Sequence, residues 1–256
     1  MTDELLVERR DRVLWLTLNR PGVHNALNAA LASALVEALE AASGDDTLRA
    51  VVLTGAGERS FCSGADLKES AGGMFRSKDV ANPIAEVLRA IENCSRLVIA
   101  RINGSVLAGG IGLVAACDLA YAAEYAKFGL PEVRVGLFPM MVAAKLLPVM
   151  DLRRLQEMAY LGETFTAAAA EGCGLITRSV PQAELDTVLS AVLAALGQGS
   201  PAAIGAGKRA LREMKEMAGG ERLAFAERAI ADLSQSPEAL EGRAAFAEKR
   251  KPWWVG

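Results

Sequence analysis

Phe61-Cys62-Ser63-Gly64-Ala65-Asp66 and Leu107-Ala108-Gly109-Gly110-Ile111-Gly112 are two glycine-rich stretches, and each follows an apolar run typical of a β-strand. Small residues in such turns allow a ligand to approach the backbone closely, and two turns can direct two N–H groups at one oxygen atom. Donors fixed in this way stabilise negative charge that develops on a carbonyl oxygen, and loss of one donor typically costs about 3 to 4 kcal/mol of transition-state energy. The sequence therefore predicts an enzyme that polarises a carbonyl group.

Strand and helix patterns alternate around these stretches. Alternating apolar residues predict two paired strands, Leu5 to Arg9 and Val13 to Leu18, around a polar turn. Helical spacing of apolar residues then alternates with short buried strands. The expected elements are a helix from Asn28 ended by Ser43-Gly44-Asp45, a strand from Ala50 to Thr54, a helix from Pro83 to Asn93, a strand from Leu97 to Ile102, a short helix after Gly109 and a strand from Asp118 to Ala122.

This alternation predicts an α/β fold, and the strand-strand-helix order favours a spiral of such units over a doubly wound sheet. Beyond about Ser200 only helix patterns follow, with Ser200-Pro201 and Ser236-Pro237 as helix starts. We expect residues 1–196 to form the spiral core and residues 197–256 to form a helical region. Its apolar residues, such as Leu223 and Phe246, need a partner surface, so we expect this region to mediate oligomerisation.

Composition excludes several classes of protein. A formal charge of −3 over 256 residues provides no general attraction to nucleic acid or to anionic membranes. No secretory signal or membrane-spanning stretch is visible, so we expect a cytoplasmic protein. The four cysteines form no Cys-x-x-Cys pair, and His24 is the single histidine, so we expect no disulfide, no metal site and no bound cofactor.

Two other motif readings compete with the carbonyl-polarising turns. Gly110-Ile111-Gly112-Leu113-Val114-Ala115 fits a dinucleotide-binding pattern, but that pattern needs its glycines directly after the first strand of the fold. Ser63 is a candidate nucleophile, but no Gly-x-Ser-x-Gly turn surrounds it. Both interpretations have weaker support in the sequence than the pair of carbonyl-polarising turns.

A series of motifs in order carries a family resemblance. The motifs are Asn25-Ala26-Leu27-Asn28, Val51-Val52-Leu53-Thr54-Gly55, Phe61 to Lys68, Ile102-Asn103-Gly104, Ala108-Gly109-Gly110, Ala116-Cys117-Asp118 and Phe128-Gly129-Leu130-Pro131-Glu132. Together they resemble the enoyl-CoA hydratase/isomerase (crotonase) superfamily. The similarity runs from about Val13 to Ile176 and resumes at Phe246 to Arg250, so it covers most of the chain.

The resemblance implies a crotonase-like spiral, a C-terminal trimerisation region and an acyl-CoA thioester as substrate. It implies a homotrimer or a dimer of trimers. The backbone N–H groups of Ala65 and Gly109 would bind the thioester oxygen, and Glu132 would move protons. A carboxylate in an apolar pocket titrates closer to neutral pH, which suits this task. The alternative for Glu132 is a surface carboxylate paired with Arg134.

The resemblance also implies which residues bind CoA. Lys68, Arg59 and Lys249 match basic positions near its phosphates, and Lys249 would reach in from the C-terminal region, either its own or a neighbour's. The stretch from Val23 to Ala26 would lie along the adenine. The implied contacts are Val23, Ala26, Arg59, Ala65, Asp66, Leu67, Lys68, Gly109 and Lys249.

One departure from the family pattern bears on the reaction. Typical family hydratases place a second glutamate where this chain has Gly112, so the pair of carboxylates that grips the attacking water is incomplete. One carboxylate beside an oxyanion hole can still shift a double bond, and hydration remains open if another group assists. The alternative is an acyl-CoA-binding protein without activity. A second departure is Phe138-Pro139-Met140-Met141-Val142, whose flexible Met side chains favour an apolar acyl group or serve core packing.

Overall fold

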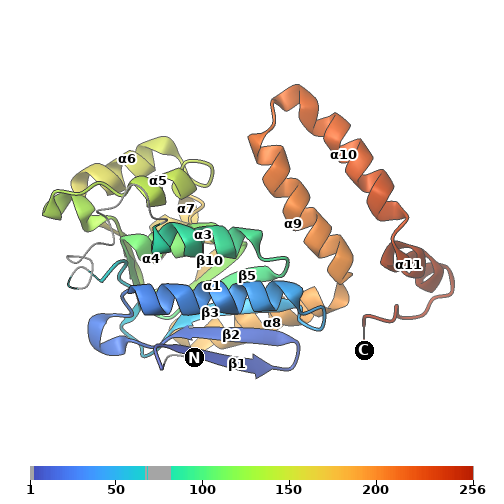
Figure 1. Ribbon diagram of the computed structural model, residues 1–256, viewed down its shortest axis with the longest axis horizontal. Helices are drawn as coiled ribbons and strands as arrows, with labels where there is room; N and C mark the ends of the chain where they lie inside the picture. Colours follow the sequence, from blue (N-terminus) through green and yellow to red (C-terminus); the bar gives the residue numbers. More distant parts are fainter. Residues whose placement is uncertain (1–2, 67, 69–81, 256) are drawn as a thin grey trace.

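The computed structural model describes residues 3–66, 68 and 82–255. Two sheets, packed helices and a projecting helical arm make up the molecule (Figure 1). The larger sheet has the strand order β1-β2-β3-β5-β7-β10, and the smaller one has the order β4-β6-β8-β9. Both combine parallel pairs with one antiparallel pair, which is β1 with β2 in the larger sheet and β8 with β9 in the smaller.

Along the chain, a strand of the larger sheet is repeatedly followed by a strand of the smaller sheet. The strands of the larger sheet are β1 (Leu5–Arg10), β2 (Val13–Leu18), β3 (Ala50–Gly55), β5 (Leu97–Ile102), β7 (Leu119–Ala123) and β10 (Arg178–Val180). Those of the smaller sheet are β4 (Ser60–Cys62), β6 (Ser105–Leu107), β8 (Lys127–Gly129) and β9 (Thr164–Thr166). Because β3, β5 and β7 are each followed by a strand of the smaller sheet and then by a helix, the predicted strand-strand-helix spiral is confirmed.

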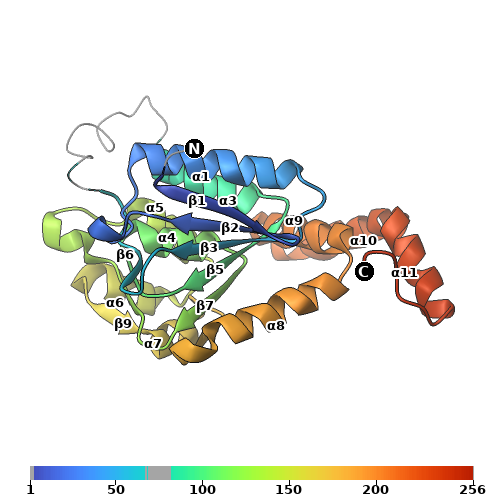
Figure 2. The ribbon, with the colours of Figure 1, turned by 90° about the horizontal axis from the view of Figure 1, so that it is seen from below.

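Helices cover both faces of the larger sheet (Figure 2). Helix α1 (Ala29–Gly44) and helix α3 (Pro83–Asn93) lie side by side on one face, and α8 (Leu185–Gln198) runs along the other. The remaining helices of the core are α4 (Gly109–Ala116), α5 (Met140–Leu146), α6 (Leu152–Leu161) and α7 (Ala167–Gly172). Short 3₁₀ helices span Pro21–Val23, Pro131–Val135 and Gln182–Glu184.

Local signals in the sequence set these helix boundaries. The Asn28 side chain accepts a hydrogen bond from the N–H of Leu31 and caps α1, and Asn82 caps α3 in the same way. Ser200 and Ser236 cap the two later helices that start with proline, as the sequence predicts. These caps satisfy backbone donors that would otherwise have no partner.

Two buried asparagines tie the ends of the spiral turns together. The Asn25 amide donates to the carbonyl oxygens of Ala56 and Ser60, at 3.1 and 2.8 Å. Asn103 donates to the carbonyl oxygen of Gly55 at 2.7 Å. Both side chains are almost fully buried, and a buried polar group without partners is costly, so these bonds fix the loops between the two sheets.

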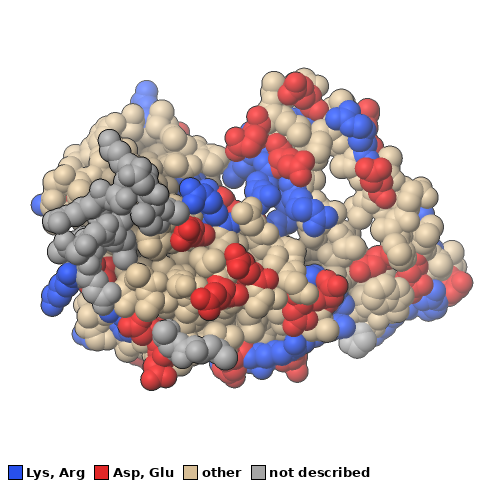
Figure 3. Space-filling model, viewed as in Figure 1, with Lys and Arg blue, Asp and Glu red and all other residues tan. Residues whose placement is uncertain are grey.

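Helices α9 (Pro201–Glu216), α10 (Gly219–Ser234) and α11 (Pro237–Ala247) form an arm that projects from the core (Figure 1). Neither α9 nor α10 buries a residue fully, and Leu211, Leu223 and Ile230 are each more than 60 % exposed. Helix α8 crosses the predicted boundary between residues 196 and 197, and that domain division stays a prediction. In the space-filling view basic side chains gather where α9 meets the core, and Lys208, Arg212 and Lys215 of α9 line a hollow there (Figure 3).

Among the described residues, no single helix is both long and apolar enough to cross a bilayer. One pair, Gln182–Gln198 with Pro201–Glu216, meets the length and composition criteria together, but a bend of 105° separates its halves.

Two glycines of α4 respond differently to an added methyl group. A Cβ at Gly110 would lie 2.4 Å from the carbonyl oxygen of Cys62, whereas a Cβ at Gly112 would meet the end of the Leu88 side chain at 3.3 Å. We expect Gly110→Ala to destabilise the protein by more than about 1 kcal/mol, because backbone of β4 must shift. Gly112→Ala gains helix propensity of up to about 1 kcal/mol, offset in part by movement of Leu88. Chemical denaturation of both variants checks this; equal losses would contradict it.

Candidate active site

A cavity of about 400 Å³ lies where the 3₁₀ helix Pro131–Val135 and α5 face the glycine-rich turns. Most of its lining is apolar. The residues around it are Ser63, Ala65, Ile84, Ala108, Gly109, Pro131, Glu132, Arg134, Val135, Leu137, Phe138, Pro139, Met140, Met141 and Val142. Ala65, Gly109 and Glu132, which the sequence analysis selected from separate motifs, thus border one cavity.

The backbone around Ala65 directs the N–H of Ala65 away from the segment around Leu27, with which it pairs. Leu27 pairs with Ala65 in a short parallel bridge, in which Leu27 donates to the carbonyl oxygen of Gly64 at 2.7 Å and accepts from Asp66 at 2.8 Å. Since hydrogen-bonding groups alternate sides along an extended chain, the N–H of Ala65 points to the opposite side. No acceptor among the described residues takes it.

The N–H of Gly109 is the second donor without an acceptor in the described part of the chain. Gly109 opens α4, and the first N–H groups of a helix have no partner within the helix. The preceding residue, Ala108, has φ of 50° and ψ of −126°, a conformation that costs a non-glycine residue about 1 to 3 kcal/mol. Its N–H is held by the carbonyl oxygen of Gly129 at 2.9 Å, which keeps this strained turn in place.

The two turns touch through their backbones. A Cβ at Gly64 would lie 2.7 Å from the backbone nitrogen of Gly109, so only glycine fits there, and its φ of +88° also favours glycine. A Cβ at Gly109 would lie 3.6 Å from the backbone nitrogen of Ala65. The two candidate donors are therefore neighbours across the junction of two turns of the spiral.

Glu132 enters the cavity from the 3₁₀ helix that follows β8. Its Oε2 atom is buried and has no hydrogen-bond partner among the described residues. Burial raises the pKa of the Glu132 carboxyl above its ordinary value, and the residue's own backbone N–H opposes this in part. The alternative pairing of Glu132 with Arg134 is not found, because no ion pair joins them.

The surroundings of Gly112 are apolar and filled. A Cβ there would contact Leu88 of α3 at 3.3 Å and Val142 of α5 at 3.4 Å. Both residues are buried, and Val142 also lines the cavity. Among the described lining residues Glu132 is the one carboxylate. A second carboxylate at position 112 would therefore need both apolar neighbours to move.

Asp66 forms a buried ion pair with Arg20. Its carboxylate lies 3.0 Å from Arg20, which also lies 3.0 Å from Glu4 and donates to the carbonyl oxygen of Ala26 at 2.7 Å. The Arg20 and Asp66 side chains are 12 % and 10 % exposed. Arg20 thus holds the residue that directly follows Ala65, a positioning role that the sequence analysis did not foresee.

The other predicted CoA contacts fall into three groups. Val23 and Ala26 lie beside the Ala65 turn, because the Ser63 side chain donates to Val23 and Leu27 pairs with Ala65. Lys68 is exposed and follows Ala65 by three residues in the chain. Leu67 lies outside the described residues. The structure does not bring the remaining two basic residues to the cavity: Arg59 lines a separate hollow with Tyr125, and Lys249 follows α11 on the arm.

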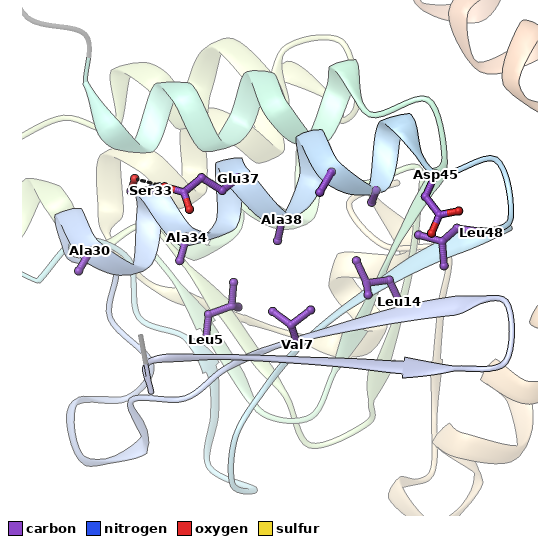
Figure 4. A pocket seen from close by; sticks show the side chains of 12 residues that line it. Leu5, Val7, Leu14, Ala30, Ser33, Ala34, Glu37, Ala38, Asp45 and Leu48 are labelled. Carbon is purple, nitrogen blue, oxygen red and sulfur yellow. Dashed lines mark hydrogen bonds between the residues drawn. The ribbon is translucent and has the colours of Figure 1, made fainter. Parts of the chain in front are cut away.

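A larger cavity between α1 and the β1–β2 hairpin does not suit catalysis (Figure 4). Its walls are mainly alanine and leucine side chains, and its two carboxylates, Glu37 and Asp45, point to solvent-facing partners such as Ser33 and Thr47. Within residues 3–66, 68 and 82–255, no three His, Cys, Asp or Glu side chains gather as a metal site.

Comparisons with known proteins agree with this geometry. The family model described as enoyl-CoA hydratase/isomerase matches residues 8–256. The chain belongs to the enoyl-CoA hydratase/isomerase family. It is 36 % identical to 2,3-dehydroadipyl-CoA hydratase of Escherichia coli K12, with 99 % of both chains covered. Identity to carnitinyl-CoA dehydratase of Salmonella arizonae is 33 %, over the whole of both chains.

Solved structures of the family share the fold. The enoyl-CoA hydratase of Mycobacterium smegmatis superposes with a TM-score of 0.90 at 36 % identity, over 99 % of both chains. AtuE of Pseudomonas aeruginosa superposes with a TM-score of 0.92 at 32 % identity. The enoyl-CoA hydratase/isomerase family is thus shown both by sequence and by fold, and the crotonase-like architecture with its C-terminal helices is confirmed.

Truncation of Arg20 is expected to damage the Ala65 turn. Arg20→Met leaves the carboxylate of Asp66 buried without its cation, and removal of one partner of a buried pair typically costs about 3 to 5 kcal/mol. The double variant Arg20→Met/Asp66→Asn removes one of the two carboxylates that pair with Arg20, the other being Glu4, and should recover part of this loss. Denaturant unfolding of the two single variants and the double variant gives the coupling energy, and strict additivity would contradict the pairing.

Replacement of Glu132 is expected to stabilise the folded state. Because the folded-state pKa is raised, this carboxyl favours folding below its ordinary pKa and loses that contribution as pH rises through the raised value. Glu132→Gln should therefore have a higher Tm than the parent at pH 8, with the difference shrinking toward pH 5. Thermal unfolding at both pH values measures this. A difference that does not change with pH would contradict the burial of an ionised carboxylate.

Proposed function

We propose that this chain catalyses double-bond isomerisation of unsaturated acyl-CoA thioesters. The N–H groups of Ala65 and Gly109 form an oxyanion hole for the thioester oxygen, and Glu132 removes a proton and returns it at another carbon. The observation that carries the proposal is the convergence on one apolar cavity of two backbone N–H groups and of the Glu132 Oε2 atom, none of which has a hydrogen-bond partner among the described residues.

Each part of this arrangement has a defined role. The thioester enolate carries its negative charge on oxygen, which the two N–H groups and the positive end of α4 stabilise. Glu132 acts first as a base and then, once protonated, as an acid. A raised pKa suits both steps, because the protonated and ionised forms lie closer in energy near neutral pH. The apolar walls exclude water and strengthen these interactions.

Isomerisation fits the cavity better than hydration does, because it needs one proton-transferring group. Addition of water also needs a second group that holds and activates the water molecule. The position of that group in typical family hydratases is Gly112, and Leu88 and Val142 fill the space beside it.

Hydration is the second candidate, favoured by the names of the relatives. The Escherichia coli relative is a hydratase, and several others are described as probable enoyl-CoA hydratases. In this case Glu132 would activate the water and protonate the α-carbon in turn. An acyl-CoA-binding protein without activity is the third outcome.

The arm supports an oligomer as part of the proposal. Leu223, Ile230, Leu240 and Phe246 expose between 51 and 87 % of their surface on α10 and α11, and such apolar faces are typical of subunit contacts. We propose a homotrimer or a dimer of trimers built through this region, with Lys249 placed to reach a CoA phosphate. The substrate is the CoA thioester itself; the absence of a metal or redox cofactor and a cytoplasmic location stay predictions.

Substrate conversion separates these candidates. With 3-enoyl-CoA, the parent protein should generate the absorbance of a conjugated thioester, and with 2-enoyl-CoA it should consume that absorbance slowly or not at all. Glu132→Gln should lower kcat by about 10² to 10⁴, the range for loss of a general acid–base group. Rapid loss of the signal from 2-enoyl-CoA would instead establish hydration.

A matched control separates binding from chemistry. Glu132 and Gln have the same shape, so CoA-thioester binding, measured by calorimetry, should be nearly unchanged in Glu132→Gln. Parent protein that binds the thioester and converts neither substrate would overturn the catalytic proposal and leave the binding function.

A further inference from the structure

A cavity of about 780 Å³ lies on the face of the larger sheet opposite α1 and α3. Helix α8 covers the β7 side of this face, and the cavity opens over β2 between α8 and the segment Trp254–Val255. It shares no lining residue with the candidate active site. Its volume is that of a small-molecule site.

Two arginines at one end of this cavity form no ion pair with a carboxylate of the described residues. Arg12 and Arg49 lie at the starts of neighbouring strands, since Arg49 donates its backbone N–H to the carbonyl oxygen of Arg12 at 2.7 Å. Both guanidinium groups are directed at the carbonyl oxygen of Trp254, Arg49 at 2.9 Å and Arg12 at 3.5 Å. In the part of the chain that the structure describes, no carboxylate forms an ion pair with either of them.

Arg49 also has an unused donor. Its Nη1 atom is buried and lacks an acceptor among the described residues. Burial lowers the pKa of Arg49, and the nearby charge of Arg12 lowers it further. Because a guanidinium group stays protonated in proteins, the result is a concentration of positive charge that an anion would relieve.

The other charges around the cavity are largely matched. Arg10 pairs with Glu8 at 2.7 Å, and Arg101 pairs with Asp186 at 2.6 Å. Asp11 lies in the exposed turn of the hairpin. Glu238 attracts Arg49, but its carboxylate already accepts hydrogen bonds from Ser200 and from the N–H of Ala202. Within the described part of the chain, the cavity's positive charges that lack an ion-pair partner are therefore those of Arg12 and Arg49.

The rest of the cavity provides an apolar surface and one more donor. Trp15 extends from β2, and its indole N–H is buried without an acceptor among the described residues. The guanidinium of Arg10 lies 4.2 Å from the centre of the Trp15 ring and covers it. Leu189 and Leu193 of α8 line the opposite wall. A ligand here would meet cations at one end and apolar side chains along its length.

We propose that this cavity binds a small amphiphilic anion, with its carboxylate or phosphate head group on Arg12 and Arg49 and its apolar body between Trp15 and α8. Charge-assisted hydrogen bonds from guanidinium to such head groups are stronger than bonds between neutral groups. This inference is independent of the proposed reaction, because the two sites share no residue.

Titration with octanoate and with octyl phosphate tests this site, and inorganic phosphate at equal ionic strength is the control for charge alone. At least one octyl compound should bind the parent protein with micromolar to millimolar Kd and quench tryptophan fluorescence, with inorganic phosphate weaker. Arg12→Gln and Arg49→Gln should each weaken binding about tenfold, the loss expected for a charged hydrogen bond. The octyl compound that binds more tightly, octanoate or octyl phosphate, identifies the head group as a carboxylate or a phosphate.

Three further variants serve as controls for the binding experiment. Arg153→Gln removes an exposed arginine on α6 and should leave binding unchanged. Trp15→Phe keeps an aromatic ring but removes the indole N–H, so it should weaken binding less than the loss of either arginine. Glu132→Gln should bind the octyl compounds as the parent does, which separates this site from the proposed reaction. The inference is overturned if the parent binds neither octyl compound, or if Arg153→Gln weakens binding as much as Arg49→Gln.

Discussion

The close approach of two backbone turns, around Gly64 and around Gly109, is the constraint on which the candidate site depends. No side chain fits between them at Gly64, and Gly110 meets the carbonyl of Cys62 at a distance that excludes a Cβ. The spiral brings these turns together because β4 and β6 are neighbours in the smaller sheet. Two N–H groups that have no acceptor among the described residues thereby border one cavity, and the strain at Ala108 is a local cost of that placement.

The chemistry then follows from what else enters the cavity. Glu132 arrives on a short 3₁₀ helix directly after β8, the next strand of the same sheet, so three successive spiral turns supply the three groups. The remaining walls are mostly apolar, which raises the pKa of the carboxyl and suits a group that must both accept and return a proton. Leu88 and Val142 beside Gly112 complete this apolar environment, and neither supplies a second carboxylate.

Elements with strong local signals are predictable from sequence. Asn28, Pro83, Ser200 and Ser236 mark helix starts that the structure reproduces, and buried apolar runs locate β3 and β5. The shared cavity of Ala65, Gly109 and Glu132 follows from motif order and family resemblance.

Contacts set by tertiary packing are not predictable in this way. The ion pair of Arg20 with Asp66 joins residues far apart in the chain. The positive φ of Ala108 has no signal in its own residue type. The Arg12 and Arg49 pair depends on two strand ends meeting the chain near Trp254, and neither arginine belongs to a motif. Such features arise from the register of the sheet and from where distant segments pack, so only coordinates can reveal them.

In the proposed site, two backbone donors from separate turns hold one thioester oxygen. The most direct measurement is a crystal structure of the Glu132→Gln variant with a bound enoyl-CoA. The account predicts the thioester oxygen about 2.7 to 3.1 Å from the backbone nitrogens of both Ala65 and Gly109, with the α-carbon facing the side chain at position 132. A thioester oxygen bonded to only one of these nitrogens, or a thioester bound outside this cavity, would contradict it.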